Sequence, residues 1–297
     1  MRLPYAPVFA LLTGALIWGL VWFPYRALRE AGLAAAWATV FTYGVAWLLL
    51  AFRFGGEVWR TGPDRWLVAI AISAGAANGG FLIAVMYGQV ARVVLLFYLA
   101  PAWTVGFAWW LLGERPRAVT LATTALALAG AGVMLWNPGV GLPWPAVPAE
   151  WLALLAGIAF AGSNVLVPRT AHVETGVRSF NIFSGSVLLG LMAALSLGQP
   201  LAMPTPAWPM LMLVPIIGLT MLLCNWIVQF GLTQTPANQA IVIYLSELVF
   251  AAASGWLLAG EALGWKEAAG GTLVMIASLL SAWAATPKPT HPKASGT

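Results

Sequence analysis

The chain has 297 residues, of which 61% are hydrophobic and only 8% are charged, and its mean hydropathy is +0.86. Soluble domains carry about 25% charged residues, so this composition excludes a soluble globular protein and indicates an integral membrane protein. The 14 Lys and Arg exceed the 9 Asp and Glu and give a formal charge of +5. These basic residues are spread between apolar runs and form no dense patch, which argues against a nucleic acid as partner.

Apolar runs of about 20 residues, the length that spans a bilayer as a helix, follow one another along almost the whole chain. We expect ten transmembrane helices, in chain order at residues 6–27, 34–53, 66–88, 91–112, 118–136, 151–169, 178–197, 208–232, 238–258 and 266–285. A Pro- and Gly-rich linker at 137–150 cannot continue a helix and separates residues 1–136 from 151–285. The Pro-rich polar tail at 286–297 is expected to be disordered. The predicted fold class is an all-α integral membrane protein.

The two halves of the chain resemble each other. LLFYLAPAWTVGFAWWLLGE, which ends at Glu114, aligns with VIYLSELVFAAASGWLLAGE, which ends at Glu261. Tyr98 aligns with Tyr244 at an offset of 146 residues, and Glu114 with Glu261 at an offset of 147. We therefore expect two five-helix repeats, and an odd number of crossings places the second upside down relative to the first. Inverted repeats are characteristic of secondary transporters, whose binding site lies near the midplane between the halves, so the sequence predicts a central cavity.

The distribution of Lys and Arg between the loops predicts their side of the membrane, because cytoplasmic loops carry an excess of basic residues. With the N-terminus inside, the cytoplasmic segments hold ten basic residues and the outer segments hold four. The ten are Arg2, Arg53, Arg60, Arg65, Arg115, Arg117, Arg169, Arg178, Lys288 and Lys293, and the four are Arg26, Arg29, Arg92 and Lys266. We therefore expect a multi-pass protein of the cell (inner) membrane with both termini in the cytoplasm.

Several short motifs resemble a known superfamily. Each half ends its fourth helix in Leu-Leu followed by Gly-Glu or Ala-Gly-Glu, Trp18 precedes a glycine in the first helix, and Pro101 lies within Tyr-Leu-Ala-Pro. These features resemble the drug/metabolite transporter superfamily of the EamA type over nearly the whole chain. Within it, RVVLLFYLAPAW from Arg92 and VIYLSELVF from Val242 are similar to the YddG-type aromatic amino acid exporters.

This resemblance implies a ten-helix exporter with a central cavity that moves aromatic or hydrophobic amino acids out of the cytoplasm by alternating access. A multidrug or other metabolite efflux transporter of the same superfamily is the alternative function. The expected partners are the lipid bilayer, a small amino acid substrate and, for coupled transport, protons. No cofactor is expected, and the protein is expected to act as a monomer.

Glu247 lies near the middle of the ninth expected helix, where an ionisable residue is costly and is by default a functional hypothesis. In the alignment it takes the position of Pro101 in the other repeat, near the shared midplane. We interpret Glu247 as a cavity-facing carboxylate that binds a substrate ammonium group or accepts a coupling proton. The alternative is a structural carboxylate that is hydrogen-bonded to a Ser, Tyr or Asn on a neighbouring helix.

Four amide side chains lie at membrane depth. Asn78 and Asn164 fall within the third and sixth expected helices, and Asn225 and Gln229 lie one turn apart on one face of the eighth. Together they indicate a partly polar cavity, although amides of this kind also hold neighbouring helices together.

Aromatic side chains are candidates for the apolar walls of the cavity. Trp18, Tyr98, Trp103 and Tyr244 could accept an apolar or aromatic substrate side chain. With 17 Trp in the chain, most must face lipid or the interface, so each aromatic also has a lipid-facing interpretation. Arg92 is expected at the outer end of the fourth helix, with its side chain extended to the interface; pairing with a substrate carboxylate is the alternative.

An intramembrane enzyme is disfavoured because no catalytic set is present. A serine protease needs a buried Ser with a His, and an aspartyl protease needs paired acids. His172 lies in an expected loop, His291 in the tail and the only Asp, Asp64, in a loop. The sequence also lacks the spacing of metal ligands and a glycine loop that binds phosphate. A channel is a separate alternative, but the sequence lacks the rings of charge that a channel uses. Secondary transport is the predicted class of function, with no metal site.

Overall fold

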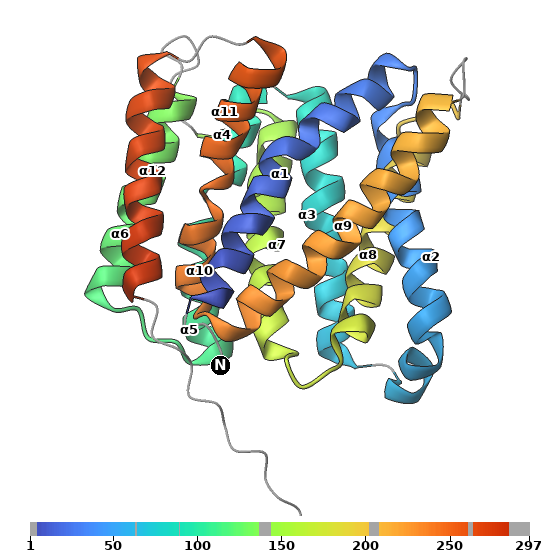
Figure 1. Ribbon diagram of the computed structural model, residues 1–297, viewed down its shortest axis with the longest axis horizontal. Helices are drawn as coiled ribbons and strands as arrows, with labels where there is room; N and C mark the ends of the chain where they lie inside the picture. The colour runs from blue at the N-terminus through green and yellow to red at the C-terminus, as the bar shows by residue number, and fades with distance from the viewer. Residues whose placement is uncertain are drawn as a thin grey trace, which may run out of the picture.

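The computed structural model describes residues 5–62, 64–88, 90–136, 144–201, 208–260 and 264–284. In this part of the chain all regular structure is helical, with no strand, and the helices form one bundle (Figure 1). The first half contains α1 (Ala6–Glu30), α2 (Ala35–Thr61), α3 (Arg65–Tyr87), α4 (Val90–Phe97), α5 (Ala100–Leu112) and α6 (Ala118–Leu135). The second half contains α7 (Pro148–Arg169), α8 (Thr175–Ser196), α9 (Trp208–Gln234), α10 (Ala237–Tyr244), α11 (Glu247–Ala259) and α12 (Trp265–Ala284).

Ten described segments are long and apolar enough to cross a membrane; α4 with α5 forms one of them, and α10 with α11 forms another. The predicted fold class of a ten-span all-α membrane protein is thereby confirmed. The sequence pattern predicts an end of the second helix at residue 53, but α2 continues to Thr61 and stops at Gly62, whose φ of 67° breaks the helix. The expected tail at 286–297, residues 137–143 of the expected linker, and Glu261 lie outside the described residues.

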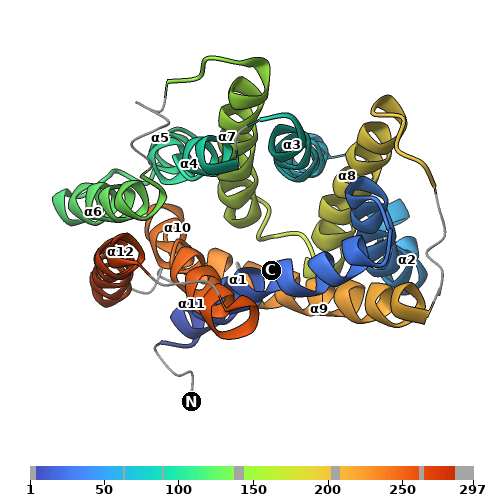
Figure 2. The same cartoon turned by 90° about the horizontal axis from the view of Figure 1, so that it is seen from above.

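The helix pairs of the two halves correspond to each other. α3 packs on α7 and α8, and its counterpart α9 packs on α1 and α2; likewise α5 packs on α7, and α11 packs on α1. Two further pairs, α2 with α8 and α6 with α12, join each helix to its own counterpart. In the view from above, α6 and α12 lie at one end of the bundle and α2 and α8 at the other (Figure 2). This arrangement is what two related five-helix units produce when they face each other.

Two of the spans are broken near their middle. The fourth span divides into α4 and α5, and the ninth divides into α10 and α11, with 8 and 13 residues in the two parts of both spans. Both end at a left-handed glycine, Gly113 with a φ of 70° and Gly260 with a φ of 66°. The break expected from Pro101 in the span at 91–112 lies just before that proline, whereas the prediction of a continuous helix at 238–258 is wrong.

The two breaks have different local causes. Pro101 has no N–H to donate and disfavours the helical conformation in the residue before it. In the other span, the Ser246 hydroxyl donates to the Ile243 carbonyl at 2.8 Å and so competes with the backbone ladder. Tight backbone bonds, such as Ala102 N–H to the Leu99 carbonyl at 2.9 Å, close the turns. Each break is thus compatible with the membrane interior, where every backbone group needs a partner.

The ends of the broken helices correct the sequence alignment. Both parts of the fourth and ninth spans correspond at a constant offset of 147 residues. At this offset Tyr244 corresponds to Phe97, and Glu247 corresponds to Ala100 rather than to Pro101. The alignment at Tyr98 and Tyr244 is therefore out of register by one residue.

Small residues allow α3 and α8 to approach closely. The pattern Gly75-x-x-x-Gly79 predicts a helix contact, but only one of its two glycines lies at the point of closest approach. A Cβ added at Gly75 would collide with the backbone carbonyl of Gly185, whereas one added at Gly79 would lie 3.6 Å from Leu189, an ordinary contact. The two positions therefore differ in what they tolerate.

We predict that Gly75→Ala lowers the free energy of unfolding by about 1 to 3 kcal/mol, because the added methyl group overpacks the α3–α8 contact. Gly79→Ala is the matched control, since the same methyl group finds room there. Thermal unfolding of the purified protein in detergent measures both effects. An equal loss of stability in the two variants would contradict the packing described above.

Candidate functional site

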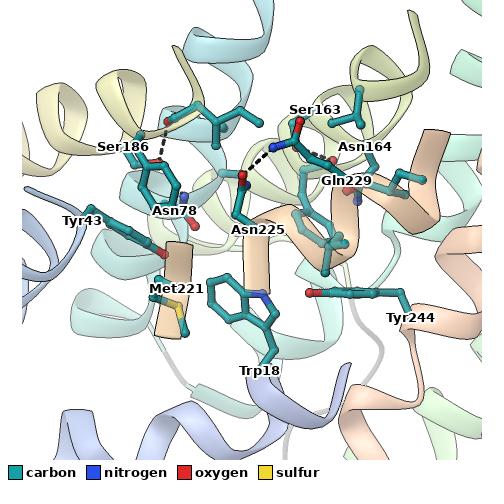
Figure 3. Close-up of a pocket in the computed structure, with 18 residues that line it drawn as sticks. Trp18, Tyr43, Asn78, Ser163, Asn164, Ser186, Met221, Asn225, Gln229 and Tyr244 are labelled. Carbon is teal, nitrogen blue, oxygen red and sulfur yellow. Dashed lines mark hydrogen bonds between the residues drawn. The ribbon is translucent and has the colours of Figure 1, made fainter. Parts of the chain in front are cut away.

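A cavity lies between the two halves of the bundle (Figure 3). Its lining comes from α1, α2 and α3 of the first half and from α7, α8, α9 and α10 of the second. The centre of a water molecule can reach about 110 Å³ of it. One bound water needs roughly 10 to 15 Å³ by this measure, so the cavity can hold several waters or part of a small organic molecule.

Six of the ten residues predicted to bind substrate line this cavity. They are Trp18 on α1, Asn78 on α3, Asn164 on α7, Asn225 and Gln229 on α9, and Tyr244 on α10. Tyr43, Phe160 and Phe183 also line it, although the sequence analysis did not single them out. None of the 18 described residues that line the cavity carries a formal charge.

The other four predicted residues are not among those that line the cavity. Trp103 is 39% exposed on the outside of α5, which fits its lipid-facing interpretation, and Pro101 is buried in the first turn of the same helix. Tyr98 and Glu247 form a pair: the Tyr98 hydroxyl donates to Glu247 Oε1 at 2.8 Å. The expectation that Glu247 faces the cavity therefore needs correction, since its carboxylate points at a tyrosine of the other broken span.

The position of Glu247 favours a carboxylate for two local reasons. It is the first residue of α11, at the positive end of the helix dipole, which stabilises negative charge. The hydrogen bond from Tyr98 adds a partner from the other half of the chain. This is the environment expected of the structural interpretation, and it also joins the two helix breaks directly to each other.

A buried arginine lies beside the cavity, and the sequence pattern did not mark it as functional. Arg178, expected as one of the cytoplasmic basic residues, is only 2% exposed. Its guanidinium donates through Nη1 to the carbonyls of Thr170 at 2.8 Å and Val173 at 3.2 Å, at the end of α7, and through Nε to Gln229 Oε1. Arg178 forms no ion pair with any residue that the structure describes. The guanidinium therefore holds the α7–α8 turn against α9 and places a positive charge one residue behind the cavity wall.

Amide and hydroxyl groups continue this network along the cavity wall. Gln229 Nε2 donates to Ser179 Oγ at 2.6 Å and to Asn225 Oδ1 at 2.5 Å, and Ser179 Oγ donates to the same Asn225 oxygen at 2.8 Å. On another side of the cavity, Asn78 Nδ2 donates to Ser186 Oγ at 2.8 Å. Asn78, Asn225 and Gln229 thus both line the cavity and hold helices together.

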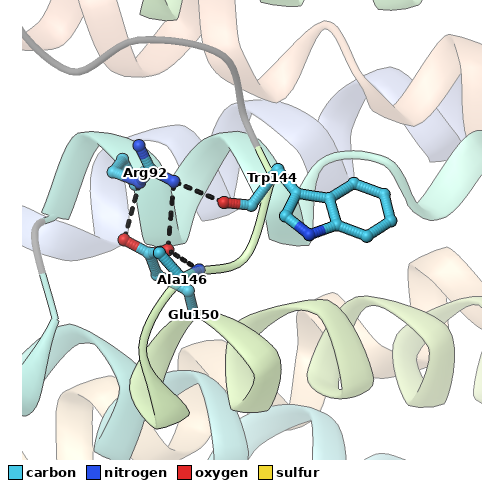
Figure 4. A network of polar contacts seen from close by, with 4 residues as sticks. All are labelled: Arg92, Trp144, Ala146 and Glu150. Atoms are coloured by element: carbon cyan, nitrogen blue, oxygen red, sulfur yellow. Dashed lines mark hydrogen bonds and ion pairs between the residues drawn. The ribbon is translucent and has the colours of Figure 1, made fainter.

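A partly buried guanidinium lies where α4 and α7 begin (Figure 4). Arg92 Nε lies 2.6 Å from Glu150 Oε1, and the two side chains are 12% and 5% exposed. Arg92 also donates to the Trp144 carbonyl at 2.5 Å, and Ala146 N–H donates to Glu150 Oε2 at 2.7 Å. The expectation that Arg92 extends to the interface is therefore wrong. The sequence signal for this pair is weak, because Glu150 reads as an ordinary acidic residue in the first turn of a helix.

No group of three or more His, Cys, Asp and Glu residues that could hold a metal ion is found among the described residues. The cavity lining offers amides, hydroxyls and aromatic rings. These groups suit the reversible binding of an organic molecule.

Comparison with known proteins identifies relatives over most of the chain. The sequence model of the EamA-like transporter family matches residues 6–136 and again residues 147–283. An uncharacterized transporter from Archaeoglobus fulgidus is 26% identical over 223 residues, which cover 74% of this chain and 77% of that protein. A crystal structure superimposes with a TM-score of 0.74 at 18% identity, covering 93% of this chain and 96% of the other. At this identity the structural match speaks for the fold alone.

We predict that Glu150→Gln lowers the free energy of unfolding by about 3 to 5 kcal/mol, because it removes the buried carboxylate that pairs with the partly buried guanidinium of Arg92. Glu30→Gln is the control: its pair with Arg26 has the same chemistry at 2.9 Å, but the side chains are 49% and 62% exposed. Exposed pairs contribute less than about 1 kcal/mol. Thermal unfolding in detergent compares the two variants, and similar shifts in both would show that the Arg92–Glu150 pair does not stabilise the α4–α7 contact.

Proposed function

Because the chain belongs to the EamA-like transporter family, we propose that it is a secondary transporter that carries amino acids with aromatic or other apolar side chains out of the cell by alternating access. The family and the ten apolar spans make it a multi-pass membrane protein. Its location in the cell (inner) membrane and the cytoplasmic position of both termini belong to the proposal. The ten basic residues of the inner segments, against four in the outer segments, support that orientation.

The chemistry of the cavity carries the proposal for the substrate. Aromatic rings from Trp18, Tyr43, Phe160, Phe183 and Tyr244 supply large apolar surfaces, and rings prefer tilted or offset contact with other rings. Amide groups line the same space (Figure 3). A molecule with one apolar part and one strongly polar part, such as an amino acid with an aromatic side chain, satisfies both kinds of wall.

The absence of charge from the described lining narrows the substrate further. A cavity that binds a multiply charged anion needs basic side chains, and the described lining has none. An amino acid zwitterion has no net charge, and its two ionic groups accept and donate hydrogen bonds that amides can supply. Asn164 supports this role, because its Nδ2 atom is buried without a hydrogen-bond partner among the described residues.

The pairing of helices supports alternating access. α3 packs on α7 and α9 on α1, in corresponding positions of two units that surround one cavity. Rocking one unit against the other would open the cavity to each side in turn. The Arg92–Glu150 pair joins α4 of the first unit to α7 of the second, so this contact must separate when the bundle opens at the end where α4 and α7 begin.

Among the described residues, Glu247 is our candidate site for a coupling proton. Glu247 bonds to Tyr98, and these two residues lie at the breaks of the ninth and fourth spans. Protonation would neutralise the Glu247 carboxylate, which accepts the hydrogen bond from the Tyr98 hydroxyl. The hydrogen bond between the two halves would then be weaker. We therefore propose that proton binding at Glu247 favours the movement of the broken spans.

We predict that liposomes containing the purified protein take up labelled tryptophan and phenylalanine at least about tenfold faster than threonine. Threonine has no aromatic ring and therefore forms fewer contacts with the rings of the cavity, which lowers its affinity and its transport rate. Protein-free liposomes give the background. Transport of threonine at the rate of tryptophan would contradict the aromatic preference. Transport of none of the three amino acids would overturn the substrate proposal and favour efflux of drugs or other metabolites.

We predict that Glu247→Gln abolishes accumulation of tryptophan driven by an imposed pH gradient and leaves downhill exchange of tryptophan intact, because the amide cannot bind and release a proton. Glu30→Gln, at an exposed acid, is the control and retains gradient-driven accumulation. Uptake in the presence and absence of the gradient is measured for both variants. Gradient-driven accumulation that persists in Glu247→Gln would show that Glu247 is structural.

A further inference from the structure

We infer that Arg178 fixes the direction in which the cavity amides donate hydrogen bonds, so that the cavity holds an amino acid in one orientation, with its carboxylate at Asn225 and its ammonium group at Asn78. This inference rests on the proposed function and adds to it the two ends of the binding site. Arg178 itself does not line the cavity, so it is a positioning residue.

Asn78 and Asn225 occupy the same place in the two halves of the chain. They lie 147 residues apart, which is the constant offset of the neighbouring broken helices, on the corresponding helices α3 and α9. Both are partly buried and line the cavity (Figure 3). An identical residue at equivalent positions would give the cavity two identical ends if the surroundings were also identical.

The orientation of the Asn225 amide follows from a chain of donors that begins at Arg178. A guanidinium has only donors, so the Gln229 atom that it contacts must be the carbonyl oxygen. The Gln229 NH₂ group then faces Ser179 and Asn225, and the Asn225 atom that receives it must be Oδ1. The Asn225 NH₂ group is left without a hydrogen bond to any described residue, and it is available to the cavity as a donor.

The orientation of the Asn78 amide is opposite. The single hydroxyl proton of Ser186 is donated to the Ile182 carbonyl at 3.1 Å, so the hydroxyl oxygen can only accept from Asn78. Asn78 therefore directs its NH₂ group at Ser186. Its Oδ1 atom has no hydrogen bond to any described residue and is available to the cavity as an acceptor.

One end of the cavity thus presents donors and the other presents an acceptor. A carboxylate only accepts hydrogen bonds and an ammonium group only donates them, so an amino acid zwitterion fits this pair in one direction. The positive charge of Arg178 lies behind Asn225, separated from it by Gln229, and attracts the carboxylate to the same end.

The first half of the chain lacks this relay. The counterpart of Arg178, the fourth residue of α8, is Ala38, the fourth residue of α2. The counterpart of Gln229, 147 residues earlier in the chain, is Leu82. The polarity of the cavity therefore has its origin in the second half alone.

The test uses isothermal titration calorimetry on the purified full chain with three ligands that share an indole ring. Tryptophan has both ionic groups, tryptamine lacks the carboxylate and indole-3-propionate lacks the ammonium group. We expect the wild type to bind tryptophan more tightly than either analogue. If it binds none of the three, the amino acid proposal and this inference fail together.

The same substitution at the two asparagines is the matched comparison. Asn225→Asp keeps the accepting oxygen but replaces the donor that faces the cavity with a negative oxygen. We expect it to lower the affinity for tryptophan and for indole-3-propionate by about 10- to 100-fold, which is the usual effect of losing a hydrogen bond to a charged group. The affinity for tryptamine should stay unchanged. Asn78→Asp keeps the acceptor that faces the cavity and should retain tryptophan and tryptamine. If wild type binds tryptophan and the two variants change the three affinities alike, the orientation is wrong although the substrate class stands.

Arg178 is tested by the ratio of the affinities for indole-3-propionate and tryptamine, which a general loss of stability would not change. Arg178→Lys keeps a group that only donates and should preserve this ratio. The side chain introduced by Arg178→Gln can accept hydrogen bonds as well as donate them, so the amides of Gln229 and Asn225 lose their fixed orientation. The preference for indole-3-propionate over tryptamine should then fall about tenfold or more. An unchanged ratio in Arg178→Gln, measured on folded protein, would overturn the role of Arg178.

Discussion

The need to pair every polar backbone group inside the bilayer is the constraint on which this structure depends. It explains why each described span is helical and why the two breaks, at Tyr98–Leu99 and Leu245–Ser246, are short turns closed by their own backbone bonds. The same requirement applies to side chains at this depth. The side chains of Gln229, Asn225 and Ser179 form hydrogen bonds with one another. The Asn225 NH₂ group, which has no hydrogen bond to a described residue, is available to the cavity.

The ten spans could be predicted from the sequence because hydropathy over about 20 residues responds to the thickness of the bilayer and not to packing. The breaks could not be predicted with the same method, since the residues at both breaks are mostly as apolar as those of the flanking helices. Pro101 gave a signal for one break. Ser246 gave none, because a serine inside a helix usually returns its hydroxyl to the backbone without interrupting it.

The candidate site was predictable only in part, for a physical reason. Asn78, Asn164, Asn225 and Gln229 stand out because amides are costly in lipid, and all four line the cavity. Among the aromatic residues, Trp18 lines the cavity and Trp103 faces outwards, yet both environments are apolar and composition cannot separate them. Arg178 was hidden by its place near a helix end, where a basic residue normally marks the cytoplasmic side.

The two asparagines show how the halves of a duplicated chain can take different tasks without changing the residues that do them. An alignment of the halves would score Asn78 and Asn225 as identical. The chemical difference lies in their neighbours, Ser186 for one and Gln229 for the other. Where two halves of a chain carry the same side chain, the residues that orient it decide which group faces the ligand, and a comparison of specificity between relatives should begin with those residues.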